Sequence, residues 1–253
     1  KDAKYSFLLE SVEGEEKVAR YSFLAKDPEL IFKSKGRDVE ITQFKDGTPQ
    51  KSNLKVIETP LSFIREIMSQ YKPVEVPGLP RFFGGMVGYI GYDTVRFFEH
   101  LPNKKPDDLL APDIVLALVK NLIVFDHVNH KIKIVCCASI APKASHSQKL
   151  QIYLQAMEKI DQLIAELKKP FELPASSEPN IRGVSSKLKI KSNVTASQFK
   201  KMIVHAKEKI RAGDIIQTVL SQRLSCAIGT QPFNIYRALR SVNPSPYMFY
   251  LNL

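Results

Sequence analysis

Residues 122–135 read LIVFDHVNHKIKIV, in which two apolar runs flank a polar segment. The runs 122–125 and 131–135 are rich in β-branched and aromatic residues, as strands are, whereas 126–130 has the composition of a turn. The stretch therefore predicts a β-hairpin. A second hairpin is predicted around Asp46-Gly47, because an Asp-Gly pair after the alternating residues 40–44 favours a tight turn between two strands.

Short apolar or alternating segments separated by turn residues fill the chain from Tyr5 to about Val135, so this part is predicted to be mainly strands. One helix is expected within it, over 60–71, where apolar residues recur at helical spacing behind Thr59 as N-cap. A long amphipathic helix is predicted over 146–169.

Residues 170–192 contain three prolines and five serines with little periodicity, which is typical of a linker. We therefore expect an N-terminal region over 1–169, a linker over 170–192 and the start of a second domain over 193–253. The second domain is predicted to begin with a helix, because Thr195 and Gln198 have capping-box spacing and Gly213 supplies a stop.

Residues 214–224 read DIIQTVLSQRL and are predicted to form a strand with two different faces. Gln217, Ser221 and Arg223 share one face, where they could line a cavity or face water. The residue types alone favour water. A short helix is predicted over 233–240, and another strand is predicted to begin at Tyr247.

Composition excludes several classes of protein. The chain has 253 residues, of which 44% are hydrophobic and 25% charged, so wholesale disorder and a disulfide-stapled miniprotein are both excluded. Three cysteines are too few for a disulfide framework, which favours a reducing, cytoplasmic location. Asp113 and Lys120 interrupt the longest apolar candidate, 109–125, so no membrane-spanning helix is predicted. Because the start at Lys1 lacks both an initiator Met and a secretory segment, we expect a chain cut at its N-terminus.

The net charge of +11 favours an anionic partner without specifying which. A nucleic-acid-binding module is one alternative, from a different functional class. The basic residues are dispersed, and no block of five like charges occurs, so a solvated surface is favoured over a nucleic-acid interface.

Two groups of residues that could bind a phosphate or a metal ion are better explained by structural roles. Gly84, Gly85, Gly88 and Gly91 follow no phosphate-loop pattern and are predicted to allow close backbone packing. The histidines and the aspartate within 126–130 are metal-ligating residue types, but they lie in a predicted turn with no further ligand at zinc spacing. We therefore expect their partners to be local.

Four segments together resemble the large component (component I) of anthranilate synthase, a family of chorismate-utilising enzymes. They are LLES at 8–11 followed by ARYS at 19–22, GGMVGYIGYD at 84–93, IRAGDIIQTVLSQR at 210–223 and NPSPYMFY at 243–250. Each segment alone is a weak match, but the four in this order and at these separations are specific. They span nearly the whole chain.

The resemblance implies an α+β fold of packed β-sheets, a sandwich with outer helices. It also implies a lyase that catalyses the first committed step of tryptophan biosynthesis. In that reaction ammonia from a glutamine amidotransferase partner attacks chorismate with the aid of Mg²⁺, and anthranilate and pyruvate are released. L-tryptophan is the feedback inhibitor in this family.

The resemblance further implies an allosteric tryptophan site, whose two walls are the LLES and NPSPYM segments. A zwitterionic amino acid needs a carboxylate for its ammonium group and a hydroxyl donor for its own carboxylate, and the indole needs an apolar slot. Lys17 would be a further partner for the ligand carboxylate. Carried over to this sequence, the site residues are Glu10, Ser11, Lys17, Pro246, Tyr247 and Met248.

Gln217 matches the position at which isochorismate-forming relatives carry a lysine that activates water. An amide side chain takes up no proton at useful pH, so Gln217 argues against water as the nucleophile. Ammonia needs no such base. Gln217 is the one residue of this sequence that we expect to line the active site.

The resemblance also implies that the family continues well past the point matched by Leu253. The magnesium ligands, the catalytic histidine and most chorismate contacts are expected there, so no catalytic residue and no metal ligand is assigned within 1–253, and this chain alone is expected to be inactive. The nearest enzymatic alternative is aminodeoxychorismate synthase component I. The LLES segment and Tyr247-Met248 favour anthranilate synthase.

Overall fold

Two five-stranded antiparallel sheets form the larger of two units in the chain. The computed structural model describes residues 3–11, 20–45, 48–56, 58–102, 106–170 and 189–253. The larger unit combines Lys1–Lys169 with Tyr236–Leu253, and the smaller unit is Pro170–Ile235. The sequence had grouped 193–253 together, whereas here the last residues join the first because a C-terminal strand pairs with an N-terminal one.

The first sheet has the strand order β5-β4-β3-β7-β6. The predicted hairpin at Asp46-Gly47 is confirmed by strand pairing, since Lys45 is the partner of Thr48, although the two turn residues themselves lie outside the described part. The strands are β3 (Leu30–Lys35), β4 (Asp38–Lys45), β5 (Thr48–Lys55), β6 (Gly85–Ile90) and β7 (Ile114–Val119).

The second sheet has the strand order β12-β1-β2-β8-β9. Its β8–β9 hairpin confirms the prediction made from residues 122–135, with Asp126 opposite Lys131 at the turn. The strands are β1 (Ser6–Glu10), β2 (Tyr21–Lys26), β8 (Asn121–Asp126), β9 (Lys131–Cys136) and β12 (Met248–Asn252).

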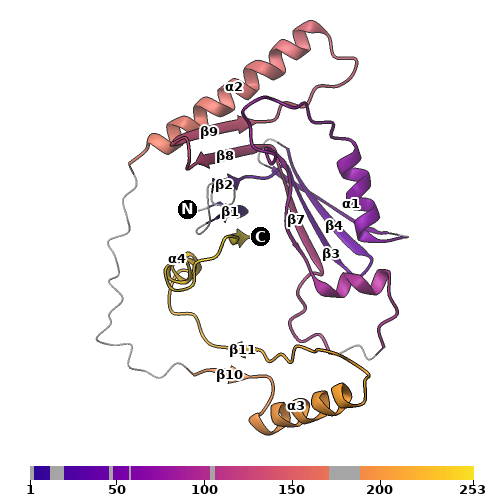
Figure 1. Ribbon diagram of the computed structural model, residues 1–253. Coiled ribbons are helices and arrows are strands. Elements are labelled where there is room, and N and C mark those ends of the chain that lie inside the picture. The colour runs from indigo at the N-terminus through magenta and orange to yellow at the C-terminus, as the bar shows by residue number, and fades with distance from the viewer. Residues whose placement is uncertain (1–2, 12–19, 46–47, 57, 103–105, 171–188) are drawn as a thin grey trace. The chain divides into compact units, whose positions relative to one another are not determined.

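Strand β7 is the centre of the core, and all six of its residues are buried. Successive side chains of a strand point to opposite faces, so β7 contributes to two layers. Leu116 and Leu118 face α1 (Pro60–Ser69), which covers that side of the sheet (Figure 1). Val115 and Ala117 face the other way and lie in a cluster with Tyr5 and Leu253. The predicted apolar stretch 109–125 is thus divided between β7 and β8.

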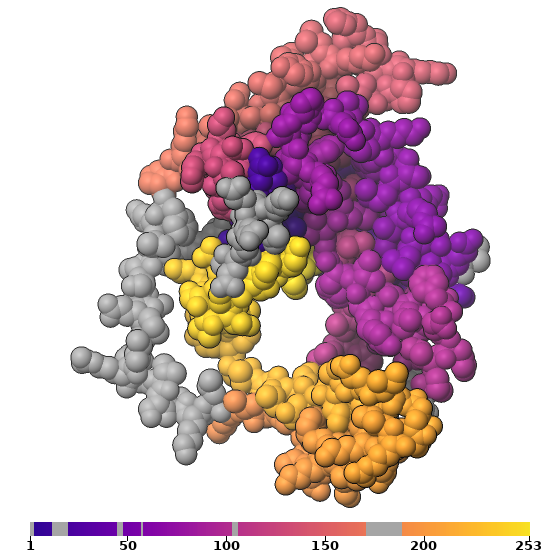
Figure 2. All heavy atoms as spheres, in the orientation of Figure 1, coloured from indigo at the N-terminus to yellow at the C-terminus, as the bar shows by residue number. Residues whose placement is uncertain are grey.

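The predicted helices of the larger unit are confirmed with small changes at their ends. Thr59 caps α1, accepting a hydrogen bond from the backbone N–H of Ser62, and a short 3-10 helix, η1 (Tyr92–Phe97), follows β6. Helix α2 (His146–Lys168) begins with a full capping box at Ser145 and buries Leu163. Figure 2 shows α2 at the surface along one side of this unit. No helix in the described ranges is long and apolar enough to cross a membrane.

The smaller unit contains α3 (Ala196–Arg211) and a two-stranded ladder of β10 (Lys191–Ser192) and β11 (Leu224–Ser225). The capping box at Thr195 and the positive φ of Gly213 confirm the predicted helix and its stop. Helix α4 (Pro232–Val242) begins here and ends in the larger unit.

The predicted strand over 214–224 is wrong: residues 214–223 form no regular structure, and only Leu224 enters β11. A strand exists only where a neighbouring strand takes up its backbone hydrogen bonds, and no strand in the described part of the chain pairs with 214–223. The apolar side chains of this stretch lie open to solvent as a result, with Ile216 96% and Val219 80% exposed.

The glycines at 84–93 lie where the backbone of β6 approaches β7, as predicted. A Cβ atom added to Gly88 would lie 1.9 Å from the carbonyl oxygen of Val115, closer than atoms can approach. Around Gly229, by contrast, there is nothing within 4 Å of such an atom. The strand pair β6–β7 therefore requires glycine at 88.

We expect Gly88→Ala to lower the free energy of unfolding by about 1–3 kcal/mol, because β6 must shift away from β7 to accommodate the methyl group. Urea denaturation measures this change. Gly229→Ala is the matched control and should stay within about 0.5 kcal/mol of the original protein. Equal stability of the two variants would contradict the close approach.

Asp126, at the end of β8, is the buried acid of the second sheet. Arg20 binds both of its carboxylate oxygens at 3.2 Å, and the Asn129 side chain donates to Oδ2 at 2.9 Å. Lys133 Nζ lies 3.4 Å away. The hydrogen bonds from Arg20, and then those from Asn129, hold the pKa of Asp126 well below its ordinary value of 3.8, although burial opposes the shift. The aspartate of this turn thus has structural partners.

A depressed carboxylate pKa stabilises the fold above the ordinary pKa, and this contribution disappears as the pH falls below it. We therefore expect the stability of the original protein to fall more steeply between about pH 5 and pH 2.5 than that of Asp126→Asn, which is less stable at neutral pH. Urea denaturation at each pH measures both trends. Asp161→Asn, which alters an exposed carboxylate on α2, should follow the original curve; parallel curves for Asp126→Asn would contradict the assignment.

Candidate functional site

The register of β1 and β12 brings together the two walls of the site expected from sequence. Glu10, the last residue of β1, is the direct partner of Met248, the first residue of β12. Paired residues of an antiparallel ladder point to the same face of the sheet, so Glu10 and Met248 are neighbours on one face. Leu8 and Tyr250 are the next pair on that face.

Helix α4 supplies the direct partners of the Glu10 carboxylate. The Tyr236 hydroxyl donates a hydrogen bond to Glu10 Oε2 at 2.5 Å, and Arg240 Nε lies 3.3 Å from the same oxygen. Tyr236 is only 6% exposed, and its ring lies 5.8 Å from that of Tyr250 in a tilted arrangement. The carboxylate is therefore held by a helix that itself packs on β12.

The protonation state of Tyr236 suits this arrangement. Burial raises the pKa of the phenol, and the neighbouring Glu10 carboxylate raises it further because the hydroxyl donates to it. The phenol therefore keeps its proton at neutral pH and remains a donor.

Ser11 follows Glu10 directly and carries a buried polar atom that the fold does not use. Its Oγ is shielded from solvent and has no hydrogen-bond partner among the residues that the structure describes. Buried hydroxyls are nearly always hydrogen-bonded, so an orphaned one beside a carboxylate suggests that a ligand completes the set.

The other residues expected at the site differ in position. Pro246 and Tyr247 come immediately before β12 and are exposed, whereas Met248 is buried beside Glu10. Lys17 lies outside the described residues. Gln217 is exposed on the irregular stretch 214–223 of the smaller unit. The structure thus pairs Glu10 with Met248, and Ser11 and Tyr247 adjoin these two residues in the chain.

Sequence reasoning missed Tyr236 and Arg240. The signal was present, because residues four apart share one face of a helix and both belong to the predicted helix 233–240. A second polar pair was also missed. Ser22 is the partner of Glu10 on β2, and its Oγ lies 2.8 Å from Nε2 of His127. Only the pairing of β1 with its neighbours shows that these side chains belong near Glu10.

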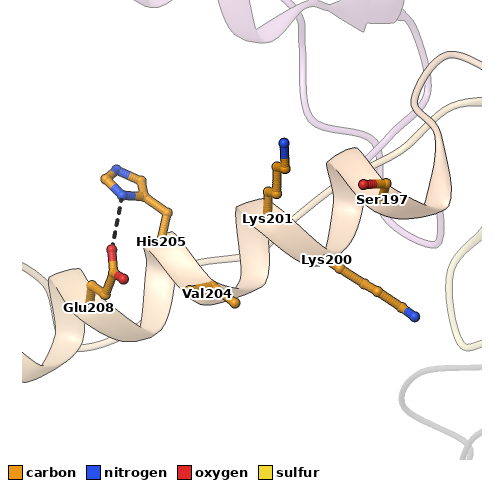
Figure 3. A pocket seen from close by; sticks show the side chains of 6 residues that line it. All are labelled: Ser197, Lys200, Lys201, Val204, His205 and Glu208. Carbon is orange, nitrogen blue, oxygen red and sulfur yellow. Dashed lines mark ion pairs between the residues drawn. The ribbon is translucent and has the colours of Figure 1, made fainter.

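A shallow concavity on α3 of the smaller unit offers a weaker candidate (Figure 3). Its lining comes from one face of a single helix, where His205 Nδ1 lies 3.6 Å from Glu208 Oε2. Small-molecule sites need walls from several elements, so we assign no site to this concavity. The lining residues are Ser197, Lys200, Lys201, Val204, His205 and Glu208.

Comparison with known proteins gives the family. The sequence model of the chorismate binding enzymes matches residues 6–253. The chain belongs to this family. The chain is 38% identical over 246 residues to anthranilate synthase component 1 of Acetivibrio thermocellus, covering 97% of this chain and 48% of the relative. It is 35% identical over 263 residues to that of Pseudomonas putida, covering 99% and 49%.

A solved structure supports the fold of this chain. Anthranilate synthase component I from Streptococcus pneumoniae TIGR4 superposes with a TM-score of 0.64 at 29% identity, over 90% of this chain and 46% of that one. The predicted α+β fold of packed sheets with outer helices is confirmed. The chain spans about half the length of the curated relatives it matches.

The magnesium ion implied by the resemblance does not fit the described part of this chain. Within that part, no group of three or more His, Cys, Asp or Glu side chains could hold a metal ion. Asp126 is the most buried carboxylate and already has Arg20 and Lys133 as partners. We assign no magnesium ligand to these residues.

Replacing the buried Ser11 hydroxyl, which has no described partner, should cost no stability. We expect Ser11→Ala to leave the free energy of unfolding unchanged within about 0.5 kcal/mol, or to raise it, since no hydrogen bond is lost. Ser22→Ala is the matched control, and loss of its bond to His127 should lower stability by about 1–2 kcal/mol. Urea denaturation compares the two, and equal losses would contradict the assignment of Ser11.

Proposed function

We propose that this chain is part of component I of an anthranilate synthase, the enzyme that converts chorismate and ammonia to anthranilate and pyruvate at the start of tryptophan biosynthesis. Ammonia comes from a glutamine amidotransferase partner. Magnesium and its ligands, with the catalytic histidine, belong to residues beyond Leu253. Gln217 lines the active site and, being unable to act as a base, leaves ammonia rather than water as the nucleophile.

We further propose that L-tryptophan binds between the LLES and NPSPYM segments as a feedback inhibitor. The observation that carries this proposal is the pairing of Glu10 with Met248, which places the two segments side by side. The Glu10 carboxylate receives the ligand ammonium group, and the buried Ser11 hydroxyl, with Lys17, receives the ligand carboxylate.

The apolar part of the ligand has its own partners in this proposal. Met248 is flexible and polarizable and contacts aromatic rings favourably, so it suits one wall of an indole pocket. Pro246 and Tyr247 border the indole at the exposed side. The similarity to anthranilate synthase component 1 over nearly the whole chain supports this choice of ligand over another amino acid.

Thermal unfolding with and without L-tryptophan tests the proposed function. At a concentration of one hundred times its dissociation constant, a ligand specific for the folded state stabilises it by about 2.7 kcal/mol. We expect L-tryptophan to raise Tm by the corresponding amount, and D-tryptophan and L-phenylalanine to have no such effect. Glu10→Gln should reduce the shift to a small but measurable remainder, because the ammonium group then loses its counter-charge.

Glu40→Gln is the matched control, since Glu40 pairs with Lys51 on the surface of the first sheet. It should retain the full response to L-tryptophan. A cooperative unfolding transition that L-tryptophan leaves unmoved would contradict the feedback site and would favour an aminodeoxychorismate synthase. An equal response to all three amino acids would also contradict it.

A further inference from the structure

The two described partners of Glu10 both contact the same oxygen. Tyr236 Oη donates to Oε2 at 2.5 Å, and Arg240 Nε lies 3.3 Å from Oε2. Among the described residues, no hydrogen bond or ion pair is made to Oε1. Within the described part of the chain, the carboxylate is thus fixed through Oε2 alone.

The group that fixes Oε2 is itself rigid. Tyr236 is buried, its ring packs against Tyr250 of β12, and β12 is hydrogen-bonded along β1. Glu10 and Tyr236 are therefore held in the same small frame of helix and sheet. A flexible glutamate in such a frame has one orientation instead of many, which is the usual role of a second layer of residues behind a binding group.

We propose that Tyr236 is a positioning residue for amino-acid recognition: by holding Oε2 of Glu10, its hydroxyl presents Oε1 to the ammonium group of the ligand. This inference rests on the proposed feedback site and names a residue that the site depends on without contact to the ligand. A neutral phenol suits the role, because it orients the carboxylate without adding a second positive charge beside that of Arg240. Arg240, on the same oxygen, is the second support.

The distinguishing test compares two indole ligands by isothermal titration calorimetry. Tyr236→Phe keeps the ring and removes only the hydroxyl. We expect it to weaken L-tryptophan binding about tenfold or more, as for loss of a hydrogen bond to a charged group. Indole-3-propionate retains the carboxylate but has no amino group for Glu10 to bind, so its affinity should change by less than about twofold.

Tyr71→Phe is the matched control, because Tyr71 also donates to a glutamate, Glu29, at 3.3 Å beside α1. It should leave both affinities unchanged. Equal weakening of both ligands by Tyr236→Phe would show a general loss of structure and would overturn the positioning role. Unchanged L-tryptophan affinity in Tyr236→Phe would overturn it too.

A double-variant cycle gives the same answer by a second route if indole-3-propionate binds too weakly to the original protein. Tyr236→Phe should have no further effect on L-tryptophan binding in a Glu10→Gln background, because Tyr236 acts only through Glu10. Additive losses would overturn the inference. Failure of the original protein to bind L-tryptophan is a different outcome, since it overturns the proposed feedback site itself and this inference with it.

Discussion

Strand β1 is hydrogen-bonded along both edges, to β2 on one side and to β12 on the other, and the arrangement of the larger unit depends on this double pairing. The pairing with β12 joins residues near the two ends of the chain, so its entropy cost must be offset by burial around it. Phe7 supplies much of that burial, together with Ala25 and Val124 in the same cluster.

Successive side chains of β1 alternate between the two faces of the sheet, and this alternation determines which of them face the core. Phe7 and Leu9 belong to the core cluster, so Leu8 and Glu10 lie on the opposite face. A shift in register by one residue would place a carboxylate in the core and Phe7 outside it, at a large cost in free energy. The position of Glu10 beside Met248 is therefore enforced by the packing of Phe7. It does not depend on a ligand.

Elements whose signals are local could be predicted from sequence. The two hairpins, the capping box at Thr195 and the close approach at Gly88 each follow from a few neighbouring residues. The pairing of β1 with β12 has no such local signal, and only the resemblance to a family brought the two segments together. Tyr236 was likewise predicted as part of a helix, but its bond to Glu10 follows from tertiary packing.

Residues 214–223 show that a local pattern can also mislead. Their sequence has the pattern of a strand, but they form no strand. Alternation of apolar and polar side chains describes how a strand would present two faces, but it supplies no hydrogen-bond partner. Ile216 and Val219 remain exposed on this stretch, so the pattern has not been satisfied by burial within the described chain. Periodicity predicts a strand only where the fold also provides a neighbour.

The charges of the described residues around Glu10 support the proposal of a zwitterionic ligand over that of a cation or an anion. Glu10 and Arg240 together carry no net charge, and Tyr236 stays neutral because burial and the adjacent carboxylate raise the pKa of its phenol. A bound zwitterion adds no net charge to this partly buried cluster, so no uncompensated ion has to be desolvated. A ligand with only an ammonium group or only a carboxylate would leave one charge unbalanced. Net neutrality on both sides therefore favours an amino acid.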